Sequence, residues 1–426
     1  MPGDRGDRGV TTGAAGAPTA TGRIGRLVVM FVAHAVGTAN VTIVLASAPA
    51  VERSLGLSHA AFGAMLAAYY VSILLFSLPA GLLVDRFGIE PSLVASHALL
   101  GGGILIVGRA QGLLLAALGL LACGIGYSLI NPATARGVLT FFPARGRATA
   151  MGVKQTGVPA GSILTALATA AVGDGSWRDL ALAVALLTLL SGATSLIFGL
   201  RRPDAEGAVR VSDLLRLLAR PRLASFNGGA LLYALGQGSF FAYLVLFLHD
   251  AMNADSRTTS LCLALAHAAS AAGRVAWGLT SDLFPRGGRK LALIGCGAAS
   301  TIGAALLVVL PGIAGLIAVA PLSMVLGLTF GGYAGLAQTA AVEIVEPRMA
   351  GASIGYNMIM TNLGMALGPA LFGATVDQAG YAPAWIAIGV VMAIGAWLFS
   401  LGLVVLVTGS GIAQPATANR ACDDDR

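Results

Sequence analysis

Charged side chains are scarce in this sequence. Only 11% of its 426 residues are Asp, Glu, Lys or Arg, whereas 56% are hydrophobic. A soluble domain carries about a quarter charged residues. So few charges exclude an ordinary water-soluble surface. The hydrophobic residues come in runs of roughly 20, the length of a helix that crosses the hydrocarbon core of a bilayer.

Cysteine and lysine are also rare. The four cysteines, Cys123, Cys262, Cys296 and Cys422, stand singly, which excludes a CxxC pair or a disulfide framework and predicts small packing residues. The two lysines, at 154 and 290, are not part of a GxxxxGK(S/T) phosphate loop, and no HExxH motif is present. We therefore predict neither an enzyme nor an ATP-driven pump, and we expect no cofactor and no metal site.

Twelve apolar segments predict an all-α membrane protein, because lipid cannot satisfy open backbone groups and the alternating pattern of a membrane β-barrel is absent. The predicted spans are 24–50, 58–83, 92–109, 112–140, 150–172, 177–200, 223–249, 258–281, 290–311, 314–341, 350–377 and 383–408.

The longest polar interruption divides these spans into two sets of six. We predict a disordered tail (1–22), a six-helix bundle (23–200), a cytoplasmic linker (201–222), a second six-helix bundle (223–408) and a C-terminal tail (409–426). Within the linker, residues 211–218 form a short amphipathic stretch that we expect on the membrane surface.

The basic residues set the predicted orientation. Nineteen of the 26 lie in the tails and the even-numbered loops, four lie in the odd-numbered loops and three fall within spans. Basic residues concentrate in cytoplasmic loops. We therefore expect both termini in the cytoplasm, and a multi-pass protein of the bacterial inner membrane. No basic stripe interleaved with aromatic residues is present, so nucleic acid is not an expected partner.

An internal repeat supports two related halves. Residues 81–88, after the second span, read Gly-Leu-Leu-Val-Asp-Arg-Phe-Gly. Residues 278–290, after the eighth span, place Gly278 and Asp282 at the same spacing and end in Arg289-Lys290. A repeat of about 200 residues is typical of transporters built from two bundles that are related by a pseudo-two-fold axis.

These loops resemble the signature of the major facilitator superfamily, which reads loosely Gly-x-Leu-Ala-Asp-Arg-x-Gly-Arg-Lys. Gly81, Leu83, Asp85, Arg86 and Gly88 match it, Ile89 and Glu90 depart from its ending, and the second copy keeps the Arg-Lys ending. The resemblance covers about residues 24–408. It implies two six-helix bundles that alternate access to a central solute site.

The resemblance also implies conformational latches. Arg136 is expected to bind the signature aspartate Asp85 beside Arg86, and Glu343 is expected to play the reciprocal part with Arg286 near Asp282. Breaking such a pair shifts the balance between inward-open and outward-open states.

Two further segments resemble narrower groups. Residues 131–134 and 151–159 are similar to transporters of the cyanate-permease type and to organic-anion transporters. Residues 157–161, Gly-Val-Pro-Ala-Gly, are a loose version of an antiporter motif, which supports an exporter as the alternative.

Charged groups inside the spans are the strongest candidates for solute contact, because ionisable residues in the membrane are costly. Arg274 suits a carboxylate, and His267, seven residues earlier on the same helical face, is a candidate proton carrier. Lys154 is the third candidate. The alternatives are a bond from Arg274 to Asp282 or a nearby carbonyl, a hydrogen-bonded packing role for His267, and snorkelling of Lys154 to the interface.

Polar residues within the spans supply weaker candidates. We select Asn40, Gln237 and Asn362 as substrate contacts, and note Tyr127, Asn131, Gln155, Tyr233 and Asn357. For each, a hydrogen bond between helices is the competing interpretation.

Two span cations with no acid at similar depth favour an anionic solute. The sequence therefore predicts a secondary transporter, a proton-coupled symporter of a small monocarboxylate-like organic anion driven by the proton gradient. The alternative is an exporter of drugs or metabolites. Its expected partners are the solute and the lipid bilayer, and a monomer suffices.

Overall fold

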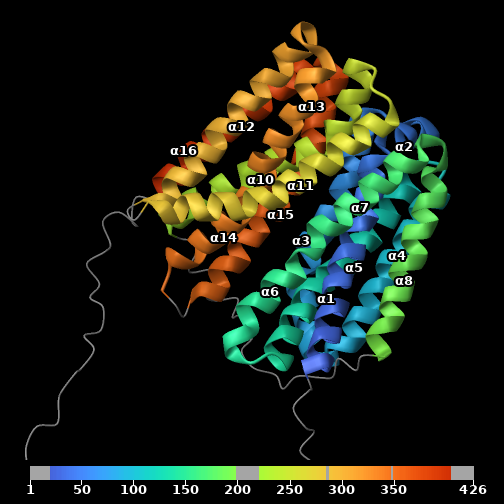
Figure 1. The fold of residues 1–426 in the computed structure, drawn as a ribbon. Helices are drawn as coiled ribbons and strands as arrows, with labels where there is room; N and C mark the ends of the chain where they lie inside the picture. Colours follow the sequence, from blue (N-terminus) through green and yellow to red (C-terminus); the bar gives the residue numbers. More distant parts are fainter. Residues whose placement is uncertain (1–19, 198–219, 285–286, 347–348, 404–426) are drawn as a thin grey trace, which may run out of the picture.

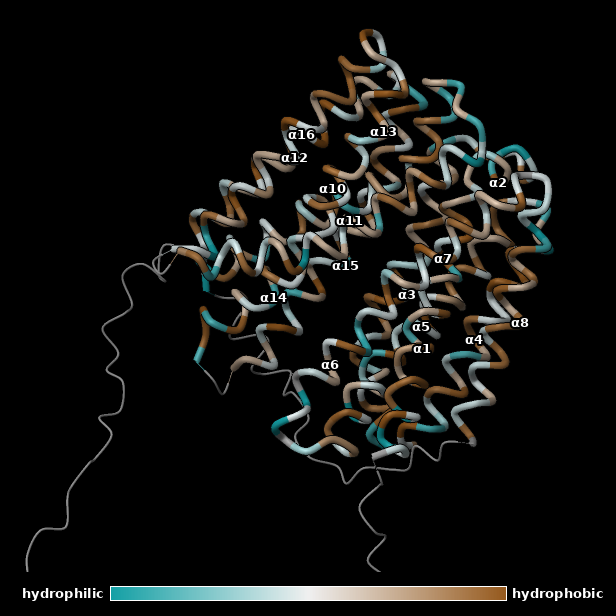
Figure 2. The backbone as a smooth tube through the Cα atoms, viewed as in Figure 1, coloured by the Kyte–Doolittle hydropathy of each residue, from teal (hydrophilic) through white to brown (hydrophobic). Residues whose placement is uncertain are grey.

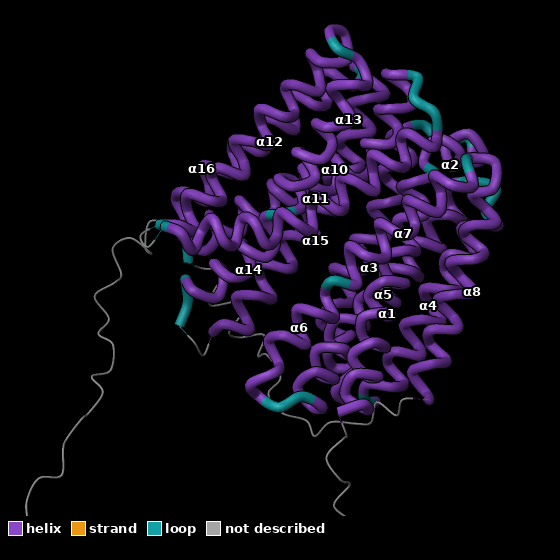
Figure 3. The backbone as a smooth tube through the Cα atoms, in the orientation of Figure 1, coloured by secondary structure: helices purple, strands orange, loops and turns teal. Residues whose placement is uncertain are grey.

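The computed structural model describes residues 20–197, 220–284, 287–346 and 349–403, and every regular element in these ranges is helical (Figures 1 and 3). The elements of the first half are α1 (Ala20–Ala46), α2 (Ala48–Leu55), α3 (His59–Phe87), α4 (Ile89–Arg109), α5 (Leu113–Phe141), α6 (Arg147–Gln155), α7 (Gly157–Val172) and α8 (Trp177–Ile197), with single turns at Ala144–Gly146 and Asp174–Ser176. Those of the second half are α10 (Pro221–Met252), α11 (Ser256–Leu283), α12 (Gly288–Ile313), α13 (Gly315–Leu326), a π-helical turn η3 (Gly327–Gly331), α14 (Tyr333–Glu343), α15 (Ala350–Ala379) and α16 (Tyr381–Gly402).

Ten helices of the described part are long and apolar enough to cross a membrane, with α13, η3 and α14 forming one of them. The α6–α7 segment is broken into pieces of 9 and 16 residues. Helix α11 has 28 residues but is more polar. Adding these two segments gives the twelve predicted crossings. Figure 2 shows hydrophobic residues along the helices and hydrophilic ones toward their ends.

A proline explains the break in the fifth crossing. Pro159 has no N–H, so it cannot donate to the carbonyl of Gln155, where α6 ends. Just beyond the break, the Val158 carbonyl accepts a hydrogen bond of 2.9 Å from Thr38 of α1. Gly161 lets the two helices approach, because a Cβ there would clash with the Ala35 carbonyl. The break is therefore fixed against α1.

The two halves pack together chiefly through α3 against α15 and α7 against α11. They meet near the end formed by α2, the start of α3 and the end of α15, which we call the α2 end (Figure 1). They diverge toward the opposite end, where α6 and α14 lie, which we call the α6 end. At the α2 end a Cβ on Gly63 would clash with the Pro369 carbonyl, so only glycine allows this close approach.

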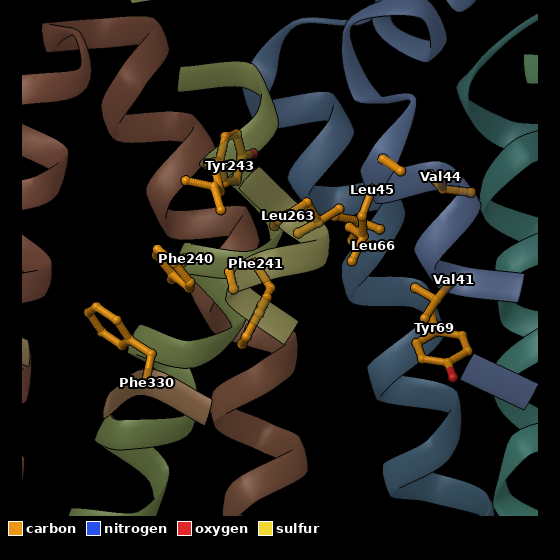
Figure 4. Packing of buried hydrophobic residues seen from close by; sticks show 14 of the residues in the cluster. Val41, Val44, Leu45, Leu66, Tyr69, Phe240, Phe241, Tyr243, Leu263 and Phe330 are labelled. Atoms are coloured by element: carbon orange, nitrogen blue, oxygen red, sulfur yellow. The ribbon is translucent and has the colours of Figure 1, made fainter. Parts of the chain in front are cut away.

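An apolar layer joins the halves next to the α2 end. Leu263 of α11 points toward Leu45 of α1 and Leu66 of α3 (Figure 4), and all three side chains are buried. Above this layer, the Tyr243 hydroxyl of α10 donates a hydrogen bond of 2.6 Å to the His59 carbonyl of α3.

Some predicted boundaries are wrong by a few residues. Helix α1 begins at Ala20, inside the predicted tail 1–22, and α10 begins at Pro221, inside the predicted linker 201–222. The amphipathic stretch 211–218, residues 1–19 and the C-terminal tail 409–426 lie outside the described residues. Cys123, Cys262 and Cys296 are buried free thiols, whereas Cys422 lies outside the described part.

Candidate functional site

Arg274 lies on α11 where this helix packs tightly on the π-helical turn. A Cβ on Gly273 would clash with the Leu328 carbonyl, and the same carbonyl accepts a hydrogen bond of 3.1 Å from the Trp277 indole. These contacts fix the turn of α11 that carries Arg274. Its side chain is within electrostatic range of the hydroxyls of Tyr127 in the first half and Tyr333 in the second half.

The Arg274 Nε atom is buried without a hydrogen-bond partner in the described part of the chain. Asp282, the partner that the alternative interpretation gives to Arg274, is instead bound by Arg289 at 2.6 Å. A buried donor without a partner is costly. An acceptor supplied by a solute would remove this cost.

His267 lies two helical turns from Arg274 on the same face of α11. Its ring stacks on Phe241 of α10 with the centroids 4.4 Å apart, and its Nε2 atom is buried without a hydrogen-bond partner among the described residues. His267 therefore packs against a neighbouring helix, as the packing interpretation expects. That interpretation also expects hydrogen bonds from the ring, and the Nε2 atom makes none with the described residues.

Lys154 does not snorkel to the interface, which corrects that alternative. Its side chain is fully buried, and its Nζ atom donates to Asn131 Oδ1 at 3.0 Å and Thr134 Oγ1 at 3.1 Å. It also lies 3.4 Å from Nε2 of His34 on α1. Sequence reasoning missed His34, although a histidine within the first apolar run is a visible signal.

One face of α5 links these cations. Tyr127 and Asn131 are four residues apart, so their side chains lie about 5 to 6 Å from each other along the helix. Asn131 contacts Lys154, and Tyr127 interacts electrostatically with Arg274. The exposed Gln155 also reaches Asn131, with 3.4 Å between Nε2 and Oδ1. One turn of α5 therefore carries both a hydrogen-bond partner of Lys154 and a hydroxyl within electrostatic range of Arg274 in the opposite half.

Asn40 does not join these residues. It is fully buried inside the first half, where its amide donates to the Val36 carbonyl at 2.6 Å and to Thr188 of α8 at 3.0 Å. We correct its predicted role to helix packing. Gln237 is half-buried on α10, and Asn362 of α15 donates to a carbonyl of its own helix. No contact joins either of these two to Arg274 or Lys154.

Two other polar candidates also pack helices together. The Tyr233 hydroxyl donates to the Leu293 carbonyl at 2.7 Å, and the Asn357 amide donates to Asn227 at 3.0 Å.

Four of the six predicted latch residues form ion pairs at the α6 end. Arg136 of α5 binds Asp85 of α3 at 2.7 Å, within the first half. Arg86 lies over the Phe87 ring at 5.3 Å. In the second half, Arg289 binds both Asp282 at 2.6 Å and Glu343 at 3.2 Å. Arg286, the residue predicted for this role, lies outside the described residues.

A second set of contacts joins the halves at the α2 end, and sequence reasoning missed it. The Asp377 carboxylate of α15 accepts hydrogen bonds from the backbone N–H groups of His59, at 3.1 Å, and Ala60, at 2.9 Å. These groups belong to the first turn of α3. Asp377 therefore caps a helix of the opposite half, where the helix dipole favours an anion.

The His59 ring lies between carboxylates of both halves. Its Nδ1 atom is 3.0 Å from Glu52 of α2, and its Nε2 atom is 3.6 Å from Asp250 of α10. The Tyr381 hydroxyl donates to the same Asp250 carboxylate at 2.7 Å. Burial raises the pKa of the Glu52 carboxyl, although the hydrogen bond from His59 opposes the rise.

Acidic residues of the described part lie away from the middle of the long helices. Each is in the short helix α2, in a connection or within two residues of a helix end. No group of three or more His, Cys, Asp or Glu side chains that could hold a metal ion occurs among the described residues. Arg274 and Lys154 therefore have no counter-charge at their own depth in this part of the chain.

Comparisons with known proteins agree with this architecture. The family model of the Major Facilitator Superfamily matches residues 30–355 and, in a second match, 226–420. An MFS-type transporter of Mycobacterium tuberculosis is 25% identical over 354 residues, which cover 80% of this chain and 77% of the relative.

Two solved structures share the fold. One is a bacterial homologue of the human lysosomal transporter Spinster in an inward-facing, occupied conformation. Its TM-score is 0.73 at 16% identity, over 88% of this chain and 96% of that one. The other is the nucleoside transporter NupG, with a TM-score of 0.76 at 14% identity over 89% of this chain and 99% of that one.

Proposed function

The chain belongs to the major facilitator superfamily and is a multi-pass membrane transporter rather than an enzyme, and from this premise we propose that it carries a small organic anion of the monocarboxylate class together with a proton. Arg274 binds the carboxylate in this proposal, because a guanidinium offers two parallel N–H donors to a carboxylate.

The observation that carries the proposal is the uncompensated charge at Arg274. The side chain interacts electrostatically with tyrosine hydroxyls on α5 and α14, its Nε atom has no partner in the described residues, and acidic residues of that part lie near helix ends or in α2 and the connections. A cation in this position is costly unless it is paired. A bound carboxylate supplies the missing charge, whereas a cationic drug adds a further repulsion.

We further propose that the α6 end faces the cytoplasm of a bacterial cell. The loops there, including those that follow α3 and α11, carry most of the basic residues, as the positive-inside pattern requires. Both termini then lie on the cytoplasmic side of the inner membrane, and the contacts at the α2 end close the outer side. This state is inward-open, and a single chain suffices for transport.

Ligand-dependent thermal stability of the purified protein tests the anion. Acetate, pyruvate, lactate and benzoate are compared with dicarboxylates, inorganic anions, nucleosides and cationic drugs. A ligand at 100 times its Kd stabilises the state that it binds by about 2.7 kcal/mol. We expect at least one monocarboxylate to raise the unfolding midpoint of the wild type, and Arg274→Ala to abolish that rise.

Two variants make the result specific. Arg274→Lys keeps the charge but loses the planar pair of donors, so we expect weakened rather than abolished stabilisation. Arg109→Ala removes an exposed arginine at the end of α4 and should respond as the wild type does. Stabilisation by cationic or neutral compounds alone, or a normal carboxylate response of Arg274→Ala, would overturn the proposal and favour the exporter.

A further inference from the structure

A pair of titratable groups is buried within the first half, at the far end of the α5 face from Arg274. His34 of α1 is 2% exposed and Lys154 of α6 is fully buried, with 3.4 Å between Nε2 and Nζ. An ammonium group has three N–H donors. Lys154 has three acceptors around it: His34, Asn131 at 3.0 Å and Thr134 at 3.1 Å. The ammonium group can therefore make all its hydrogen bonds, provided that His34 is neutral and accepts one of them. None of the three acceptors is an anion, so the charge of Lys154 has no counter-ion among them.

The surrounding helices do not supply that charge. The other charged residues on α1, α5, α6 and α7 are all cationic, namely Arg23, Arg26, Arg136 and Arg147. Arg136 is already paired with Asp85 of α3. A second proton on the pair would therefore place two cations 3.4 Å apart without an anion on these helices. Such a state is strongly disfavoured in a buried site.

A single proton can reside on either nitrogen of the pair. The Thr134 hydroxyl donates to the Ile130 carbonyl at 2.7 Å, which leaves its oxygen free to accept. That oxygen lies 3.1 Å from Lys154 Nζ and 3.0 Å from His34 Nε2. It can accept an N–H from whichever residue holds the proton.

We propose that His34 and Lys154 form the proton-binding site of the transport cycle. The pair holds one proton when the solute is absent and takes a second from water when an anion binds. This inference rests on the proposed function, because the anion at Arg274 supplies the compensating charge. Tyr127 and Asn131 are the connection: Tyr127 interacts electrostatically with Arg274, Asn131 contacts Lys154, and a single helical turn separates the two.

The pair is also placed to influence the conformational change. Lys154 is one residue before the end of α6, and His34 lies against the start of α7, where a Cβ on Gly157 would come within 2.9 Å of His34 Cβ. Helix α7 packs on α11 of the opposite half. A change of charge at the pair therefore acts at the break between α6, which lies at the α6 end, and α7, which contacts the other half.

Titration of the purified protein without added organic anion tests the pair independently of the solute. Thermal unfolding midpoints are measured between about pH 5 and 9, a range that spans the ordinary pKa of histidine. We expect acidification to destabilise the wild type, because His34 binds a proton in the unfolded chain that it disfavours in the folded, uncompensated site. His34→Gln still accepts from Lys154 but cannot bind that proton, so its loss on acidification should be smaller.

His97→Gln is the matched control. His97 is also a buried histidine of the first half, but it is bonded to the Leu93 carbonyl and lies 3.3 Å from Ser191, away from Lys154. Burial disfavours the protonated form of His97 too, so this variant should also lessen the loss on acidification, but by less than His34→Gln, because the His34 proton additionally faces Lys154. Lys154→Arg keeps a permanent cation and replaces His34→Gln if that variant does not fold. Burial disfavours the ammonium form of Lys154, so the wild type should gain stability as the pH rises toward about 9, and Lys154→Arg should not show this gain.

Transport assays in proteoliposomes then distinguish proton coupling from solute binding. The probe is the monocarboxylate that raises the unfolding midpoint of the wild type most in the thermal-stability assay. We expect His34→Gln to exchange the probe across the membrane but to lose accumulation driven by a proton gradient, at least tenfold relative to wild type. If the wild type binds no monocarboxylate, the proposed function fails. If it binds one, but His34→Gln and Lys154→Arg titrate and accumulate as the wild type does, the pair is not the proton site and the proposed function stands.

Discussion

Asp377 provides the sharpest test of how the two halves are held together. Its carboxylate caps the first turn of α3 from the opposite half, with hydrogen bonds of 3.1 and 2.9 Å to two backbone N–H groups. These contacts exist only while the α2 end is closed. Asp377→Ala should therefore destabilise the closed arrangement relative to one in which the halves separate there.

The size of the effect follows from the geometry. Loss of an N-cap costs about 0.5 to 2 kcal/mol, and loss of an anion near a helix N-terminus adds about 0.3 to 1 kcal/mol. Asp377 is exposed, so water compensates part of this loss. We expect a net change of about 0.5 to 2 kcal/mol, which corresponds to a shift of about 2- to 30-fold in the ratio of the two states.

Distances between spin labels at Arg53→Cys on α2 and Arg257→Cys on α11 measure that ratio, in a chain with Cys422 replaced by Ser. Both positions are exposed at the α2 end and belong to opposite halves. We expect Asp377→Ala to populate a longer distance.

Asp255→Ala is the control for this experiment. Asp255 caps α11 by accepting from Thr258 N–H at 2.9 Å, entirely within the second half. It should lower stability by a similar amount but leave the distance distribution unchanged. An unchanged distribution for Asp377→Ala, or equal shifts for both variants, would refute a specific role for the cap between halves.

The sequence predicted the helices well, because they depend on local composition. Runs of about 20 apolar residues identify crossings whatever their neighbours are. The exceptions are informative: the crossing that contains Pro159 breaks into two helices, and α11 is polar because it carries groups such as Arg274 and His267. These deviations from a simple span lie beside the candidate site.

Partners of side chains were predicted less well, because they depend on how helices rotate and pack. Asn40 looked like a solute contact, yet it faces α8, a neighbour 148 residues away in sequence. Lys154 looked like a snorkelling residue, yet the break at the end of α6 buries it beside His34. The cap by Asp377 spans more than 300 residues and has no local signal.

Two further predictions concern the closed α2 end, where burial and close packing decide the outcome. Burial raises the pKa of Glu52 in this state, so closure favours the protonated carboxyl, and its stabilising effect is lost as pH rises through that raised pKa. Glu52→Gln, which stays neutral, should therefore gain stability relative to the wild type as the pH rises above about 4.3, the ordinary glutamate value; thermal unfolding midpoints that run parallel for variant and wild type would contradict this. Gly63→Ala should oppose closure, because its Cβ would clash with the Pro369 carbonyl, whereas Gly102→Ala on α4 meets open space and serves as the control. The distance between the spin labels should lengthen for Gly63→Ala and not for Gly102→Ala. Because Gly63→Ala changes no charge, its lengthening should not depend on pH, which would distinguish the steric effect from the titration of Glu52.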